Sequence, residues 1–267
     1  MAWAAPDLND DFASLKEAVA GNDGAKIKSL APQVSKDSRA IVAKGDESAD
    51  VLEFAKGAND YADYALAVAA VKAGDPKTTV ELGDILLAQN PKSIYVDTMA
   101  GTYLAALGPK SGAGAQKILA GRPENEDALY YAMAANPANA GKLVAVMSKK
   151  TKPEGMSDAA WTSKKDAYLG AGYFYGGASA CGAQRWAECE RSMKAAEGLV
   201  KGGQLGSAYF YIGLAEYQLG TLTQDRTKIQ AALKYSQQAA AIPGPNQGQA
   251  SQNVAAMQKQ LGGAGKR

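Results

Sequence analysis

The sequence predicts an all-α protein, a solenoid of about six stacked helical hairpins closed by one further helix at its C-terminal end. The stretch from Asp60 to Ser93 carries most of this prediction. Its two apolar segments lie on either side of Lys72–Asp75, and it closes on Asn90–Pro91. Each segment is one helix long, so the stretch is a hairpin of about thirty-four residues, the period of a helix-turn-helix repeat.

Two further observations favour the same fold class. The chain is rich in Ala, poor in β-branched residues, and has 13 Tyr against 4 Phe, which favours close-packed helices over sheets. Prolines also recur at a similar interval. Because proline cannot continue a helix and forces the preceding residue out of helical geometry, these prolines mark hairpin ends. They are Pro91, Pro123 and Pro153.

The helices of the first half follow from these stop signals. Gly108–Pro109 is a turn, Gly121–Pro123 ends a short helix, and Asn136–Pro137 separates the two helices of a degenerate pair. Outside the 60–93 hairpin, the expected helices are Leu8–Ala20, Ala25–Ala43, Ile94–Leu107, Ala113–Ala120, Glu124–Ala135 and Ala138–Lys149.

The second half predicts two longer hairpins. Ser157 is expected to cap the first arm, a loop is expected over Gly176–Ala183, and another over Gly220–Thr227. Pro243–Pro245 closes the second hairpin. The expected helices are Ser157–Tyr175, Gln184–Lys201, Gln204–Leu219, Lys228–Ile242 and a half-polar capping helix at Gln247–Leu261.

This organisation predicts one domain over residues 7–261. It consists of an N-terminal hairpin at 7–45, repeats at 46–245 and the capping helix at 246–261, followed by a frayed tail at 262–267. Residues 1–6 include Ala2–Pro6, which resembles the small-residue end of a secretory signal. We therefore expect a periplasmic or exported protein. The alternative is an irregular N-terminus on a cytoplasmic protein.

One segment resembles a known family. Tyr211–Gly220 is similar to the first helix of a tetratricopeptide repeat, in which a large aliphatic residue, Gly or Ala, an aromatic and a turn Gly follow one another. Ala232–Tyr235 with Ala239 resembles the second helix of the repeat. Leu169–Gly170 with Tyr173 again matches the first-helix pattern. The resemblance covers residues 60–245 and implies a TPR-like superhelix. Gly83 and Thr79 depart from the pattern, so a general or irregular α-solenoid is the alternative fold.

The resemblance implies a binding function: a concave surface, lined by first helices, that holds a segment of a partner protein or peptide. Tyrosine suits such a surface because it offers a rigid face and a hydroxyl at small entropic cost. The alternative is that these rings pack between neighbouring hairpins. The inward-facing candidates are Tyr61, Tyr64, Tyr95, Phe174, Tyr175, Phe210 and Tyr217.

Several other function classes are disfavoured. Lys and Arg number 29 against 27 Asp and Glu, without a long basic cluster, which argues against nucleic acid. The longest apolar run, Ala65–Val71, is far shorter than the roughly 20 residues of a membrane span. Histidine is absent and no nucleotide-binding or hydrolase motif occurs, so we expect no enzyme activity and no cofactor.

The two cysteines bear on the compartment. If Cys181 lies in a loop before the helix that carries Cys189, the loop can fold back and pair the two in a disulfide, which fits an oxidising compartment. The alternative is two small buried hydrophobic residues, and a zinc site lacks ligands.

The leading function is thus a non-enzymatic interaction scaffold in the bacterial cell envelope. The alternatives are a periplasmic receptor for a small molecule or peptide, and a structural, self-associating subunit of an envelope assembly or filament.

Overall fold

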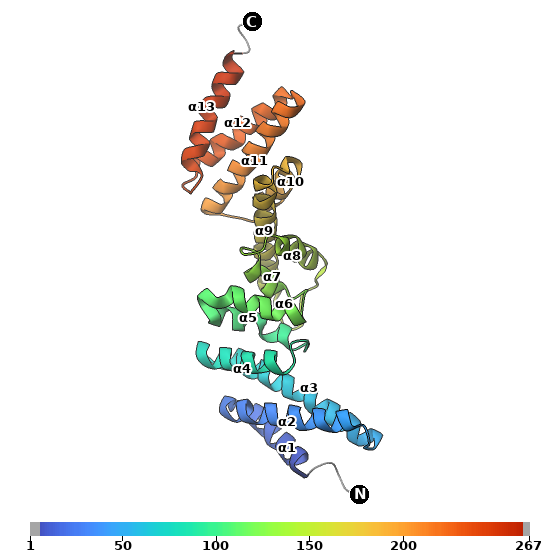
Figure 1. Ribbon diagram of the computed structural model, residues 1–267. Coiled ribbons are helices and arrows are strands. Elements are labelled where there is room, and N and C mark those ends of the chain that lie inside the picture. Colours follow the sequence, from blue (N-terminus) through green and yellow to red (C-terminus); the bar gives the residue numbers. More distant parts are fainter. Residues whose placement is uncertain (1–5, 264–267) are drawn as a thin grey trace. The chain divides into compact units, whose positions relative to one another are not determined.

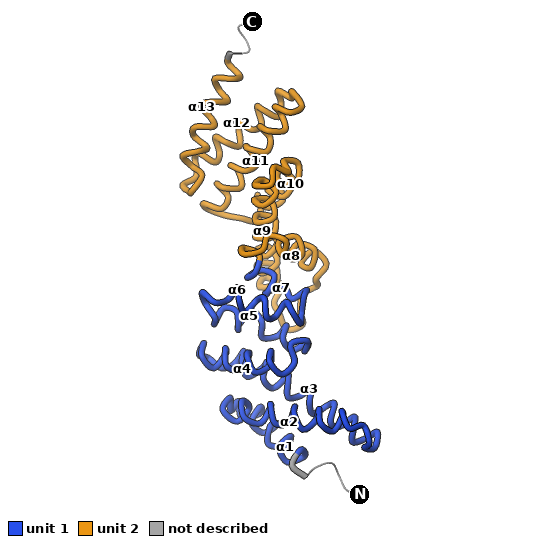
Figure 2. The backbone as a smooth tube through the Cα atoms, viewed as in Figure 1, with its two compact units in different colours: residues 1–132 blue, residues 133–267 orange. Residues whose placement is uncertain are grey.

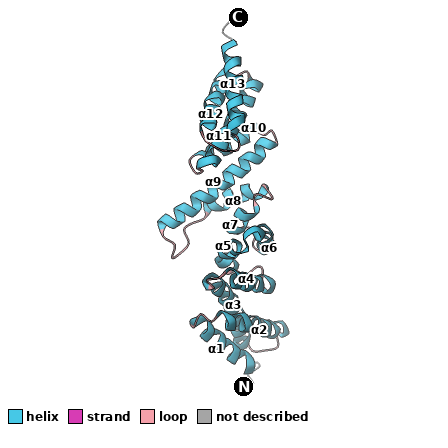
Figure 3. Ribbon diagram, turned by 90° about the vertical axis from the view of Figure 1, so that its left-hand side faces the viewer, coloured by secondary structure: helices cyan, strands magenta, loops and turns pink. Residues whose placement is uncertain are grey.

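The computed structural model describes residues 6–263. All regular elements in this range are helices and no strand occurs, which confirms the all-α prediction (Figure 3). The chain forms two compact units, unit 1 at residues 1–132 and unit 2 at residues 133–267 (Figure 2). The expected signal end over residues 1–6 lies outside the described residues except for Pro6, which begins the first helix. Of the expected tail, residues 262–263 belong to the last helix and the rest lies outside the described range.

Unit 1 is a series of helices in which each packs on the next and several also reach the one after it (Figure 1). Helix α3 touches α1, α2, α4 and α5, so it is the centre of the unit. The elements are α1 (Pro6–Ala20), α2 (Gly24–Lys44), α3 (Ala49–Lys72), α4 (Pro76–Gln89), α5 (Val96–Leu107), a 3₁₀ turn (Gly108–Lys110), α6 (Ser111–Gly121) and α7 (Glu126–Ala132).

Side-chain caps fix where the helices of unit 1 begin. The carboxylate of Asp23 accepts from the backbone of Lys26 at the start of α2, and Asp75 does the same for Thr78 in α4. Such caps satisfy backbone donors that the first helical turn leaves unpaired. Helix α2 ends at Gly45, whose φ of 67° is the left-handed conformation that glycine adopts readily.

Small residues let the helices of unit 1 approach closely. The buried face of α3 consists mainly of alanines, and Tyr103 of α5 is the largest fully buried side chain. Its ring lies over Gly83 of α4, where an added Cβ would come 2.4 Å from Tyr103 Cδ2. Gly83, which departs from the family pattern, therefore makes the space that the aromatic ring of the next helix fills.

Two acids, the buried Asp63 and the partly exposed Asp97, tie the hairpins of unit 1 together. Asp63 of α3 accepts from Gln89 Nε2 and Asn90 Nδ2, both at 2.7 Å, where α4 ends. Asp97 of α5, thirty-four positions later, accepts from Asn125 Nδ2 at 2.7 Å and pairs with Arg122 just after α6. The same connection thus recurs in two successive hairpins.

Unit 2 is likewise a run of helices packed in chain order, with α9 also touching α11 and α11 touching α13. The hydroxyl of Ser157 accepts from the backbone of Ala160, so the predicted cap of α9 is confirmed. The elements are α8 (Ala138–Lys149), α9 (Asp158–Gly182), α10 (Trp186–Glu197), α11 (Gly202–Thr223), α12 (Arg226–Ala241) and α13 (Gln247–Gly263).

Two loops of the sequence prediction are wrong because their glycines serve helix packing. Helix α9 continues through Gly176–Gly177, where an added Cβ at Gly177 would come 3.0 Å from Met193 of α10. Helix α11 continues past Gly220, which lies against Ile229 of α12 at 2.9 Å by the same measure. In both places glycine allows two helices to touch and does not form a turn.

Two helix assignments also need correction. Helix α3 begins at Ala49, well before the Asp60 at which the sequence hairpin was expected to start. Helix α7 spans only Glu126–Ala132, so it ends three residues before the expected Ala135.

Candidate functional site

Five aromatic rings form a continuous row in unit 1. They come from α1, α3 and the residue before α5, and consecutive ring centroids lie 5.5, 5.5, 5.5 and 5.6 Å apart. We call this set the aromatic row. Its members, in spatial order, are Phe54, Phe12, Tyr61, Tyr64 and Tyr95.

The row contains all three unit 1 residues that the sequence predicted, and it is partly open to solvent. Tyr64 is 36% exposed, and Ile94, beside Tyr95 in the chain, is 62% exposed. The other rings are half-buried and pack against the core. The tyrosines were expected either to contact a partner or to pack between neighbouring hairpins. In the row they pack between helices and also present part of their rings at the surface.

Phe12 and Phe54 were not predicted. Phe54 lies seven positions before Tyr61 and hence on the same face of α3, a spacing that becomes visible only when α3 begins at Ala49. Phe12 depends on how α1 packs on α3, which no local pattern shows.

A hydrogen bond and a charge hold two rings of the row, Tyr95 at its end and Phe12 within it. The Tyr95 hydroxyl donates to Asp60 Oδ2 at 3.0 Å, and the Lys16 ammonium lies 4.1 Å from the ring centroid of Phe12. Burial, followed by the hydrogen bond to Asp60, raises the pKa of Tyr95. Burial also raises the pKa of Tyr61, with Tyr64 adding to the shift. Both phenols therefore remain neutral donors at physiological pH.

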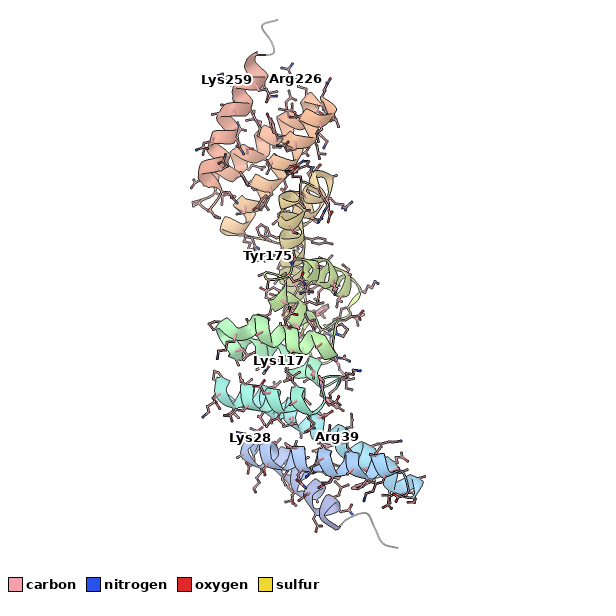
Figure 4. All side chains as sticks on the ribbon, viewed as in Figure 1. Lys28, Arg39, Lys117, Tyr175, Arg226 and Lys259 are labelled. Carbon is pink, nitrogen blue, oxygen red and sulfur yellow. A yellow bond between two sulfur atoms is a disulfide. The ribbon has the colours of Figure 1, made fainter. Side chains whose placement is uncertain are left out.

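A second aromatic group lies in unit 2, between α9 and α11. Phe174 touches Tyr175 and Tyr211, with centroids 5.7 and 6.5 Å apart, and Tyr211 touches Phe210 at 5.4 Å. We call these four rings the aromatic cluster. Tyr175, labelled in Figure 4, is its most open member at 37% exposure. Tyr211 was quoted in the family pattern but not predicted as a contact.

Tyr217 does not join this cluster. Its hydroxyl donates to Gln260 Oε1 at 3.0 Å, so it bonds to the C-terminal helix α13. Of the seven predicted contact residues, the structure thus gathers three in the row and three in the cluster and places the seventh elsewhere.

The two cysteines are joined in a disulfide, with their Cα atoms 5.0 Å apart. Cys181 lies in the last turn of α9 rather than in a loop, and Gln184, at a φ of 58°, turns the chain back toward Cys189 in α10. Both sulfurs lie within 4.0 Å of the Tyr211 carbonyl oxygen. The bond therefore closes the α9–α10 turn directly against α11, beside the aromatic cluster.

A buried acid in unit 2 belongs to a structural ion network. Glu216 of α11 accepts from Lys194 and Lys228, both at 2.8 Å, and its side chain is 5% exposed. Glu190 pairs with the same two lysines. Because every charge already has an opposite partner within three packed helices, the network stabilises the stack and leaves no free acid or base for chemistry.

A groove of about 470 Å³ runs between α8, α9 and α10. Gly141, Gly172 and Gly176 form part of its lining, together with Arg185 and Glu188. The latter two form an ion pair at 2.8 Å, so their charges satisfy each other. This groove offers space but few unpaired polar groups to orient a small ligand.

Neither a membrane-spanning helix nor a metal-binding cluster occurs in the described part of the chain. Within residues 6–263, no helix combines the length and apolar character needed to cross a bilayer. Over the same part of the chain, no group of His, Cys, Asp and Glu side chains is placed to hold a metal ion. Comparison with protein-family models, with curated proteins and with solved structures finds no match to this chain.

Proposed function

We propose that this protein is a non-enzymatic scaffold that holds a segment of a partner polypeptide. The observation that carries the proposal is the aromatic row of unit 1, in which five touching rings include the exposed Tyr64 and end at Tyr95, next in the chain to the exposed Ile94. Rigid aromatic rings, tyrosine among them, are enriched at the central contacts of protein interfaces. The aromatic cluster of unit 2 offers a second surface of the same chemistry.

We further propose a TPR-like repeat as the basis of this surface. The acids Asp63 and Asp97, thirty-four positions apart and bonded to equivalent hairpin ends, support a repeat of that period. In such a repeat the first helices of successive hairpins lie side by side. That arrangement places Tyr61 and Tyr95, also thirty-four positions apart, in equivalent positions of two hairpins.

We propose that the scaffold works outside the cytoplasm, in the bacterial cell envelope. The Cys181–Cys189 disulfide supports this location, because disulfides persist in oxidising compartments and are rare in a reducing cytosol.

Selection of peptides from a displayed library tests the scaffold proposal. Peptides that bind the full chain should bind Tyr64→Ala and Ile94→Ala at least about tenfold more weakly, because truncating a central interface residue typically has such a cost. Circular dichroism should show the helices intact, since neither side chain belongs to the core cluster of unit 1.

Leu222→Ala is the matched control. Leu222 is an exposed hydrophobic residue of α11, at 72% exposure, that belongs to neither aromatic group. Its truncation should leave affinity unchanged. Selected peptides that bind Tyr64→Ala, Ile94→Ala and Leu222→Ala equally well would show that the row is not the binding surface.

A further inference from the structure

One face of α3 alternates acidic and aromatic side chains. Positions 50, 54, 57, 61 and 64 follow one another at intervals of three or four residues, as do positions 53, 57, 60 and 64. All of them therefore lie on the same side of the helix, and the rings among them belong to the aromatic row. We call this surface the acidic–aromatic face. Its side chains are those of Asp50, Glu53, Phe54, Asp60, Tyr61 and Tyr64.

The carboxylates of this face are available to a partner. Asp50 and Glu53 are exposed, and neither forms an ion pair within residues 6–263. The positive end of the helix dipole accounts for an acid in the first turn of α3, where Asp50 lies. It does not account for Glu53, which comes after that turn.

The negative charge is concentrated at one end of the face. Residues 46–53 contain four acids and no base. Further along α3, Lys56 and the Arg39 of α2, which Figure 4 labels, line the same pocket as Asp60 and compensate its charge. A cation is therefore attracted most strongly to the end of the face where Glu53 lies.

An ammonium group of the chain itself already lies on the aromatic row. Lys16 Nζ is 4.1 Å from the ring centroid of Phe12, and that ring touches Phe54. Such a contact is attractive because the face of an aromatic ring is electronegative. The rings of the row can thus hold a cation, and the acids next to Phe54 carry more negative charge than this one lysine offsets.

Gly57 leaves the centre of the face without a side chain. The residue is exposed, and a Cβ added to it would have no atom within 4 Å. A glycine of this kind permits the backbone of a ligand to approach closely. An extended segment can therefore lie against α3 at this point, with the acids and the rings of the face on either side.

The charge of unit 1 as a whole favours the same kind of partner. Residues 1–132 contain 19 Asp and Glu against 13 Lys and Arg, a net charge of −6, whereas the whole chain carries +2. A net charge of this sign attracts basic segments and repels acidic ones, over a distance of about 8–10 Å at physiological salt.

We propose that the partner segment on the aromatic row is a polypeptide rich in lysine and arginine, whose cations contact the rings of the row and the carboxylates of Asp50 and Glu53. The proposal rests on the proposed scaffold function and adds the chemistry of the partner to it. A ring face beside a carboxylate is the combination that attracts an ammonium or guanidinium group most directly.

Amide NMR of the full chain tests this with short peptides whose two ends are blocked. The peptides share the same leucines and carry, at the same remaining positions, either Lys and Arg, or Glu, or Gln. The basic peptide should give saturable shifts at the amides of Glu53, Gly57 and Tyr64. At about 50 mM salt it should bind at least tenfold more tightly than the Gln peptide, and this advantage should shrink at about 0.5 M salt.

Substitutions tie the binding to the face. Asp50→Asn combined with Glu53→Gln should weaken the basic peptide about fivefold, the effect of removing two exposed charge contacts. Because both acids are exposed, the helices should remain intact by circular dichroism. Tyr64→Leu keeps an apolar side chain but removes the ring, and should weaken the same peptide about threefold.

Glu154→Gln combined with Asp166→Asn is the matched control. It removes the same two charges from exposed positions of unit 2 and should leave the affinity for the basic peptide unchanged.

Three results overturn the proposal: a basic peptide that gives no saturable shifts, a Gln or Glu peptide that binds as tightly, or binding that the substitutions of Asp50 and Glu53 weaken no more than the control does. The scaffold test has a separate outcome. Selected peptides that depend on Tyr64 whatever their charge uphold the scaffold and contradict its basic partner alone. Selected and basic peptides that both ignore Tyr64→Ala contradict the binding surface and, with it, this proposal.

Discussion

At the scale of single residues, Glu216 shows how a buried charge is retained in this fold. Burial opposes ionisation of its carboxyl, yet hydrogen bonds from Lys194 and Lys228 together hold the pKa below its ordinary 4.5. Hydrogen bonds to Glu190 and Glu216 outweigh burial and raise the pKa of Lys194, and the bond to Glu216 chiefly raises that of Lys228. The charged forms of Glu216, Lys194 and Lys228 are therefore favoured in the folded state.

We predict that Glu216→Gln lowers the free energy of unfolding by about 2 kcal/mol at neutral pH, the typical value of a hydrogen bond to a buried charge. Because the folded-state pKa of Glu216 is depressed, its contribution is fully present above about pH 4.5 and is lost as the pH falls through that pKa. The raised pKa values of the lysines keep their contribution present below 10.5, and it is lost at higher pH.

Urea unfolding followed by circular dichroism measures this effect. The difference between the wild type and Glu216→Gln should be large at pH 7 and shrink at pH 3. Glu188→Gln is the control, because Glu188 pairs with Arg185 but its side chain is 43% exposed. This substitution should change the free energy of unfolding by less than about 0.5 kcal/mol. A Glu216→Gln difference that stays constant with pH would contradict the assigned role of the charge.

At the scale of helices, the contact between successive hairpins depends on missing side chains. Gly121 ends α6 directly against the turn after α4, where an added Cβ would lie 2.1 Å from the Pro91 carbonyl oxygen. Backbone cannot move aside as a flexible side chain can. We predict that Gly121→Ala lowers the free energy of unfolding by about 2 kcal/mol, within the range typical of overpacking.

Gly57→Ala is the opposite case. Gly57 lies inside α3 with no atom within 4 Å of the added Cβ, so alanine should raise stability by about 0.5–1 kcal/mol through its better helix propensity. Chemical denaturation of the two variants measures both changes. Equal effects of the two substitutions would show that the Pro91 contact does not limit the approach of the hairpins.

Glycines that allow close helix contacts also explain how far the sequence could predict the helices. The turns at Lys72–Asp75, Asn90–Pro91 and Asn136–Pro137 placed α4 and the start of α8 to within a residue or two, because a Gly or Pro acts locally. Gly177 and Gly220 were misinterpreted as turns because their role is set by a partner helix distant in sequence. A local pattern contains no information about such a partner.

In the candidate site too, features that depend on local sequence could be predicted, and those that depend on packing between distant segments could not. Tyr61, Tyr64 and Tyr95 could be selected because hairpin spacing and residue type are local properties. Phe12 and Phe54 were not predicted, since they join the row only where α1 packs on α3 and where α3 begins at Ala49. Only the packed structure shows which rings meet across two helices.

At the scale of the whole molecule, each unit builds its hydrophobic core from its own residues. The core cluster of unit 1 ends at Ala132, and that of unit 2 extends from Ala180 to Ala215 with partly buried residues around it. Proteins divided in this way open by separate cooperative units, each with its own free energy. The Cys181–Cys189 disulfide lies wholly inside unit 2 and offers a way to change one unit without touching the other.

We predict that the double substitution Cys181→Ala with Cys189→Ala lowers the stability of unit 2 by about 2 kcal/mol and leaves unit 1 unchanged. The magnitude follows from the entropy of closing a loop of 8 residues in the unfolded chain. Alanine is chosen because a serine hydroxyl at these buried positions would add an unpaired polar group.

Hydrogen exchange measured by mass spectrometry should show faster exchange in α9, α10 and α11, and wild-type rates in α1 to α5. Reduction of the wild type should reproduce this pattern, whereas the double variant should not respond to reductant. Faster exchange that spreads equally through α3 would show that the two units unfold as one.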